Sequence, residues 1–272
     1  MQRILARLRS KCDCSQVTRR GFLLVPAIAL AQSTRPKLSL IWTTDAIPAA
    51  FARQAVVFPR TYICCPDQGE ALRSIERGRF PHAIKTQDSS LWNFFDRAAA
   101  NDPDAITVIT SASSDGFDSW HERSIRVPLA IRWPNHLQSR QVNELFSHVD
   151  LLPTLLALTA QPKLASAQGR DMSSWLTRGT GSKPDSVYSE GRLETRDEWR
   201  AVIRGFDKIV WNLREEIVGL YNLADDPQEQ TDLQDKREHR VNRDSMLALA
   251  RQWMTRLEDG IDAHGLRTRR PI

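Results

Sequence analysis

Cysteine is scarce in this chain of 272 residues, which contains only four. Cys12 and Cys14 precede an apolar run at 21–31, and only Cys64 and Cys65 lie beyond it. Adjacent cysteines cannot bridge to each other without a strained ring, so the sequence predicts no disulfide framework. Two neighbouring thiols also supply too few soft ligands for a thiolate metal centre.

Long apolar runs and clustered basic residues are also lacking. The run at 21–31 is too short to span a bilayer as a helix, so we expect no membrane span. The formal net charge of +5 arises within residues 1–31, where six Lys and Arg accompany a single acidic residue, Asp13. Because the remaining chain is neutral and has no basic cluster, we expect no nucleic-acid partner.

The N-terminal region has the layout of an export signal. Basic residues precede the apolar run, which ends in the small-residue pattern Ala29-Leu30-Ala31. The stretch TRRGFLL at 18–24 is typical of twin-arginine signals. We therefore expect a bacterial protein that is exported to the periplasm or the medium, with cleavage near Ala31. A basic amphipathic helix at the N-terminus is the alternative.

Strand-like and helix-like patterns alternate through the first two thirds of the chain, which favours an α/β fold. The run at 105–110 is largely apolar and β-branched, as in strands of a parallel sheet covered on both faces. The expected strands are 37–42, 55–58, 105–110 and 125–134, and the expected helices are 87–100 and 150–158, the second capped by the Asp150 carboxylate.

The last third has a different pattern. Two apolar segments, 199–203 and 208–211, flank Gly205-Phe206-Asp207 and predict a β-hairpin. A further strand-like segment follows at 219–223, and 241–257 has the spacing of an amphipathic helix. We therefore expect a small antiparallel sheet with one helix after the α/β body.

Several longer motifs follow one another along the chain: ERSIRVPLAIRWP (122–134), HVDLLPTLLALTAQP (148–162), QGRDMSSWL (168–176), DSVYSEGR (185–192), EWRAVIRGFDKIVW (198–211) and LYNLADDPQEQTDL (220–233). Taken in order, they resemble the sulfatase family of the alkaline-phosphatase superfamily. The resemblance implies a mostly parallel sheet flanked by helices, with a small C-terminal antiparallel sheet plus helix. It also implies hydrolysis of sulfate esters at a divalent metal, with a Cys or Ser converted to formylglycine as nucleophile.

The resemblance divides the chain into four parts. We expect a twin-arginine-like signal at 1–31, a shortened α/β body at 32–184 and a C-terminal subdomain at 185–260, followed by a basic tail at 261–272.

In a protein of this family, two loops would hold the metal. Hard cations such as calcium or magnesium bind carboxylate oxygens, so the aspartates of these loops are the candidate ligands. The family's first strand ends in two aspartates, where this chain has Thr43-Thr44-Asp45. Its second metal strand continues as Thr-Ser-Asp-His-Gly, where this chain has TSASSDG at 110–116. Asp45 is the first candidate ligand, and Asp115 is a second if the loop shifts. A turn or cap role is the alternative for both.

The nucleophile loop of the family is replaced in the stretch TYICCPDQGEALRSIERGRF at 61–80. Residues 78–82, GRFPH, match the family's turn, and the family spacing counted back from Gly78 places Gln68 at the nucleophile. The local pattern instead selects Cys64, for which a buried structural role is the alternative. The arginine of the motif is absent in both registers. A long family segment with a Gly-Lys-Trp-His motif is missing between 82 and 89.

These losses predict a degenerate sulfatase without a metal cofactor, whose hydrolysis is impaired or lost and which binds a sulfated or anionic glycan. One alternative is an active metal-dependent sulfatase or phosphoesterase that acts on glycan or aryl esters, with calcium or magnesium at a rebuilt site. That site would combine Asp45, Asp115 and Cys64 with His82 or His121. Another alternative is a non-catalytic partner of an intact sulfatase.

Overall fold

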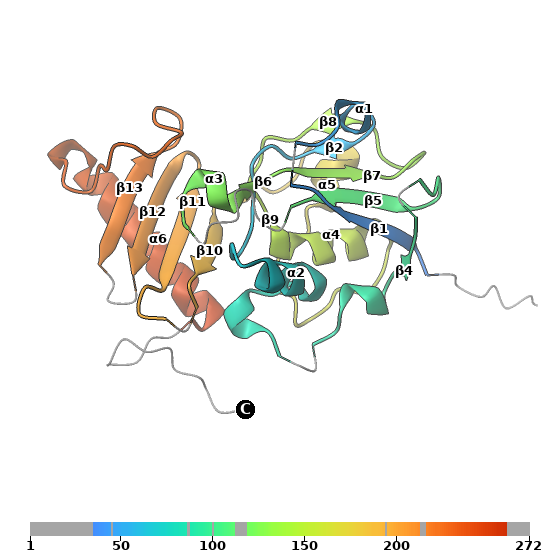
Figure 1. The fold of residues 1–272 in the computed structure, drawn as a ribbon, viewed down its shortest axis with the longest axis horizontal. Helices are drawn as coiled ribbons and strands as arrows, with labels where there is room; N and C mark the ends of the chain where they lie inside the picture. The colour runs from blue at the N-terminus through green and yellow to red at the C-terminus, as the bar shows by residue number, and fades with distance from the viewer. Residues whose placement is uncertain are drawn as a thin grey trace, which may run out of the picture. The chain divides into compact units, whose positions relative to one another are not determined.

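The main sheet forms from the apolar strands that the sequence predicts, and α2 and α4 lie along one of its faces (Figure 1). The structure is a computed structural model that describes residues 35–44, 46–85, 88–99, 101–111, 119–193, 195–212 and 216–259. Across the sheet, the strand order is β4 (Asp96–Arg97), β1 (Lys37–Trp42), β5 (Ile106–Thr110), β7 (Leu129–Arg132), β2 (Val56–Val57) and β8 (Arg140–Gln141).

The strand directions confirm the predicted mostly parallel sheet. β1 runs parallel to both β4 and β5, and β2 runs parallel to β8. β7 is the antiparallel member, paired with β5 on one side and β2 on the other. Every residue of β5 is buried, as expected for a strand covered on both faces.

Helices cover this sheet with apolar side chains at helical spacing. Ile75 of α2, Leu152 and Leu155 of α4 and Leu176 of α5 pack into one core with the strand residues. The α-helices before the C-terminal region are α1 (Ala49–Ala52), α2 (Gln68–Arg77), α3 (Glu122–Ile125), α4 (Leu151–Leu158) and α5 (Ser173–Arg178). The short 3₁₀ turns are η1 (Pro81–Ala83), η2 (Leu91–Asn93), η3 (His148–Asp150) and η4 (Arg237–His239).

The C-terminal sheet is antiparallel throughout, and it confirms the predicted hairpin at Gly205. Gly205 has a φ of 57°, a conformation that glycine adopts without strain. Helix α6 (Arg240–Leu257) packs against β11 and β12 through Met246, Ala250 and Trp253. The strands of this sheet are, in order, β10 (Val187–Gly191), β11 (Trp199–Arg204), β12 (Asp207–Asn212) and β13 (Ile217–Asn222). A three-stranded sheet has the order β6 (Arg126–Val127), β3 (Thr61–Tyr62) and β9 (Phe146–Ser147).

The predicted helix at 87–100 is wrong for the residues described there. This segment instead contains η2 and the edge strand β4, whose Asp96 and Arg97 pair with Lys37 and Leu38. Leu91 and Phe95 are buried. The prediction therefore identified the buried residues of this segment correctly, but not its backbone conformation. Pairing with the open edge of β1 outweighs the helical spacing of a short segment.

The helix predicted at 150–158 forms, but Asp150 does not cap it as predicted. Its carboxylate accepts hydrogen bonds from Ser147 N at 2.9 Å and from Arg170 N at 2.7 Å. The Arg170 guanidinium also lies 2.8 Å from Asp150 Oδ2. Asp150 thus stabilises η3 and binds the segment 168–172 to the start of α4. It does not bind the first-turn amides of α4.

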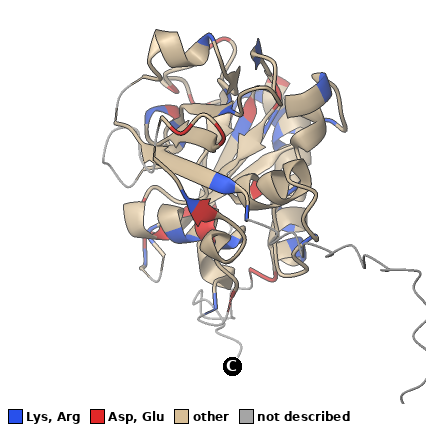
Figure 2. Cartoon of the chain, turned by 90° about the vertical axis from the view of Figure 1, so that its right-hand side faces the viewer, with Lys and Arg blue, Asp and Glu red and all other residues tan. Residues whose placement is uncertain are grey.

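Positively and negatively charged residues are interspersed along the chain in the view of Figure 2. Within the described ranges, no helix is both long enough and apolar enough to cross a bilayer. The predicted signal at 1–31 and the basic tail at 261–272 lie outside these ranges.

Candidate functional site

The carboxyl ends of β1 and β5 meet at one edge of the main sheet, because the two strands are parallel neighbours. Thr43 N donates a hydrogen bond to Thr110 O at 2.9 Å across this edge. Asp45 and Asp115, the predicted metal ligands, lie outside the described residues and stay predictions. The residues described at the two strand ends, Thr43, Thr44, Thr110 and Ser111, contribute only hydroxyl side chains.

A buried histidine lies under this edge. The Thr110 hydroxyl donates to Pro128 O at 2.8 Å, so it accepts from His148 Nε2 at 3.0 Å. Burial lowers the pKa of His148 to about 3, so the ring is neutral near pH 7. Its Nδ1 has no hydrogen-bond partner within the described part of the chain. We interpret His148 as a structural group that fixes the end of β5.

The family spacing counted back from Gly78 predicts the nucleophile position at the amino end of α2. Gln68 is the first residue of the helix and is exposed. Asp67 caps the helix, and its Oδ1 accepts a hydrogen bond from Glu70 N at 2.9 Å. A glutamine amide cannot become formylglycine and is not a nucleophile. The helix end where the family's nucleophile would lie is therefore occupied by an amide and a carboxylate.

Cys64, the alternative nucleophile, is enclosed in the core, and so is Cys65. Burial raises the pKa of the Cys64 thiol to about 12, despite a hydrogen bond with Ser74. Since the thiolate is the reactive form, this thiol is inert near neutral pH. Its backbone is also fixed, because Glu190 N donates to Cys64 O at 2.8 Å.

Glu190 belongs to a buried ionic network that sequence reasoning did not identify. His82 Nδ1 lies 2.7 Å from Glu190 Oε2. Arg200 Nε lies 2.6 Å from Asp259 Oδ2, and Arg200 Nη2 lies 2.7 Å from Glu198 Oε1. Burial disfavours the ionised form of Glu190, yet His82 and Arg200 outweigh it and lower the pKa of this carboxyl.

His82, Glu190 and Asp259 have potential ligand atoms within 4.8 Å of one another. The geometry nevertheless does not fit a divalent cation, because the buried Arg200 guanidinium contacts both carboxylates. A metal there would meet a fixed positive charge that already neutralises its ligands. His82 also follows the carboxyl end of α2, whereas the family's nucleophile lies at the amino end. The trio is a structural ion-pair network.

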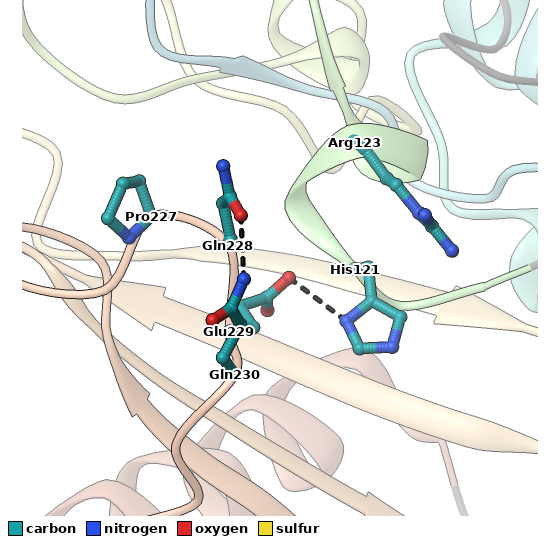
Figure 3. Close-up of a pocket in the computed structure, with 6 residues that line it drawn as sticks. All are labelled: His121, Arg123, Pro227, Gln228, Glu229 and Gln230. Carbon is teal, nitrogen blue, oxygen red and sulfur yellow. Dashed lines mark hydrogen bonds and ion pairs between the residues drawn. The ribbon is translucent and has the colours of Figure 1, made fainter.

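A second buried network surrounds Lys208, whose side chain has no exposed surface. Its Nζ lies 2.6 Å from Glu229 Oε1 and 3.7 Å from Glu122 Oε1. His121 Nδ1 lies 3.2 Å from Glu229 Oε2, as the dashed line in Figure 3 shows. The structure thus places His82 and His121 in different networks. The available signal for the network around Lys208 was a lysine directly before the apolar residues Ile209, Val210 and Trp211.

Comparisons with known proteins place this fold among sulfatases. A protein from Bacteroides thetaiotaomicron VPI-5482 whose structure is described as that of a sulfatase superposes with a TM-score of 0.71 at 13% identity, covering 85% of this chain and 96% of that chain. BT1596, a 2-O GAG sulfatase, gives a TM-score of 0.71 at 13% identity, with coverages of 83% and 93%. At these identities the likeness concerns the fold.

BT4656, solved with its substrate D-glucosamine-2-N,6-O-disulfate, matches with a TM-score of 0.52 at 18% identity. The match covers 57% of this chain but only 35% of BT4656. In sequence, the family model described as N-sulphoglucosamine sulphohydrolase, C-terminal, matches residues 117–254. This range is just over half of the chain and extends from the segment before α3 into α6. The chain therefore belongs to this sulfatase family.

Proposed function

We propose that this protein is a sulfatase-family member that does not hydrolyse sulfate esters and instead binds a sulfated or anionic glycan. The proposal depends mainly on the residues at the amino end of α2. By the family spacing counted back from Gly78, Gln68 takes the nucleophile position, and the Asp67 carboxylate caps the helix. A carboxylate at this point repels the anionic group that the reaction must bring to the nucleophile.

The described residues offer no replacement for the missing chemistry. The Cys64 thiol is buried and its pKa is raised, so it does not supply a thiolate. The hydroxyls at the ends of β1 and β5 are poor ligands for calcium or magnesium compared with carboxylates. We therefore propose that Asp45 and Asp115 do not form a complete metal site, and we assign no step of a reaction to a metal.

Glycan binding is the part of the family function that does not require a nucleophile. The fold and the C-terminal family match support it, and BT4656 was solved with a sulfated glucosamine. The test is to immobilise sulfated and chemically desulfated heparan and measure binding of the protein. We expect selective binding to the sulfated form, with no release of inorganic sulfate from it. Equal binding to both forms would contradict the glycan assignment.

Export and domain division are proposed together with this function. We propose that residues 1–31 form the export signal, with 32–184 and 185–260 as body and subdomain. Sequencing the N-terminus of protein recovered from the periplasm tests the cleavage site near Ala31.

A further inference from the structure

A pocket of about 250 Å³ lies between the last turns of α6 and the segment that precedes β10. None of the residues described at the ends of β1 and β5 lines it, so it is separate from the edge where the family's metal would lie. Sites that enclose a drug-sized ligand typically have about 300–1,000 Å³, so this pocket suits one smaller unit. Its lining includes Arg170, Lys183, Asp185, Leu249, Trp253 and Arg256.

The Arg256 guanidinium is a preorganised donor at this pocket. It lies over the Trp253 ring, with 4.8 Å between its Cζ atom and the ring centroid. The indole is fixed in turn, because Trp253 Nε1 donates to Ser186 Oγ at 2.8 Å. Such stacking orients a guanidinium without using its N–H groups. Within the described part of the chain, the Arg256 side chain has no hydrogen-bond or carboxylate partner, so its donors are left for a ligand.

Lys183 is a second exposed cation, on the segment before β10. Its side chain is 79% exposed, and its Nζ lies 3.9 Å from Glu144 Oε1, at the outer limit of an ion pair. An exposed pair of this kind is weak, so a ligand can compete for the ammonium. Lysine and arginine side chains are cationic throughout the neutral pH range. The positive charge at this pocket therefore does not depend on protonating a histidine.

Arg170 contributes hydrogen-bond donors to the lining but little net charge. Its guanidinium lies 2.8 Å from the buried Asp150 carboxylate, which neutralises it. The charge balance of the pocket is therefore set by two exposed cations, Lys183 and Arg256, and one exposed carboxylate, Asp185.

The Asp185 carboxylate determines which anions fit. An ionised carboxylate only accepts hydrogen bonds, so it repels a bare anion such as sulfate but binds hydroxyl groups. Among the described residues, it accepts only the Ser186 hydroxyl, at 3.5 Å, so most of its acceptor capacity is open. A ligand with one anionic group and several hydroxyls satisfies both kinds of side chain. Leu249 and Trp253 add apolar surface for the C–H groups of a sugar ring.

We propose that this pocket binds one acidic sugar unit of a glycan, with Lys183 and Arg256 at its anionic group and Asp185 at its hydroxyls. The anionic group is a carboxylate or a sulfate, since both accept hydrogen bonds from a guanidinium and an ammonium. The inference rests on the proposed function, for which it names the part of the protein that holds the glycan.

Calorimetric titration of the full chain tests the proposal with glucuronic acid, N-acetylglucosamine 6-sulfate, glucose and sodium sulfate as probes. We expect one site per chain that takes an acidic sugar more tightly than glucose, and the preferred acid identifies a carboxylated or a sulfated unit. The double variant Lys183→Gln, Arg256→Gln is expected to bind it at least about tenfold more weakly, because both charge-assisted hydrogen bonds are lost. The matched control is Lys163→Gln, Arg240→Gln, which removes the same charges at exposed positions outside the pocket.

Asp185→Asn distinguishes a sugar site from a site for any anion. The variant removes a negative charge, which favours sulfate and an acidic sugar alike, but only the sugar loses an ionised acceptor for its hydroxyls. We therefore expect the ratio of the affinity for the acidic sugar to that for sulfate to fall by about fivefold or more. An unchanged ratio would overturn the proposal.

Immobilised sulfated heparan distinguishes failure of this inference from failure of the proposed function. Loss of heparan binding in the folded Lys183→Gln, Arg256→Gln protein, with binding retained in the control, would support the inference. Equal heparan binding by the two double variants would overturn it and leave the proposed function intact. If the wild type binds the acidic sugar in this pocket but not heparan, only the proposed function is contradicted. Absence of binding to both would contradict both.

Discussion

Replacement of Glu229 by glutamine tests how much the buried network around Lys208 contributes to stability. Glu229→Gln preserves the shape of the side chain but removes the charge that lies 2.6 Å from Lys208 Nζ. The ammonium is fully buried and cannot be rehydrated without local opening. Breaking a buried pair by removing one partner costs about 3–5 kcal/mol. Glu122 remains at 3.7 Å and Trp120 O remains bonded to the ammonium, so we expect the lower end, about 3 kcal/mol.

Urea unfolding followed by tryptophan fluorescence measures this loss. With a denaturant dependence of about 3 kcal/mol per molar urea, the midpoint falls by about 1 M. The double variant Lys208→Met, Glu229→Gln removes both charges and is expected to recover most of the stability. A midpoint for Glu229→Gln that stays within about 0.2 M of the wild type would refute the reasoning, because it would mean that Lys208 does not need this partner.

Two further predictions concern buried titratable groups. Cys64 is expected to resist alkylation by iodoacetamide at pH 8 in the folded protein and to react at once in urea, because burial raises its pKa to about 12; rapid labelling of the native protein, located by mass spectrometry, would contradict this. The folded-state pKa of His148 is lowered to about 3 from 6.5, so the unfolded state binds more protons between these values and acid destabilises the fold. This histidine contributes a slope of up to about 1.4 kcal/mol per pH unit, and His148→Gln is expected to have a shallower loss of stability between pH 6 and pH 4 in urea titrations. If the free energy of unfolding falls equally steeply with pH in the wild type and in His148→Gln, the lowered pKa of His148 would be refuted.

Local patterns predicted the regular elements of this fold well. The β5 strand follows from its continuous apolar sequence, and the hairpin at Gly205 follows from two apolar segments around a turn. The segment at 87–100 was missed because its backbone follows the open edge of β1, which no local periodicity encodes. Asp150 was correctly placed at the start of the helix that follows it, but its partner Arg170 lies twenty residues along the chain, so its contacts could not be inferred.

The functional clusters were harder to predict, because their members are far apart in sequence. His121 and Glu229 are separated by 108 residues, and only folding brings them together. Charged residues in apolar strands were the available signal, since Arg200 interrupts such a run, Lys208 directly precedes one, and both are buried among carboxylates. The placement of the family's nucleophile position at Gln68 stays a prediction, but the helix on which the spacing from Gly78 depends does form as α2.

Hydrolysis of 4-nitrophenyl sulfate by residues 32–272 is the most direct test of the central claim. The assay is run with calcium, with magnesium and with EDTA, beside an intact sulfatase as the positive control. Gln68 at the amino end of α2 and the buried Cys64 thiol predict no release of 4-nitrophenol above the buffer rate from a folded sample. Metal-dependent release that disappears in Asp45→Ala would contradict the account and show that a rebuilt site performs the family's chemistry.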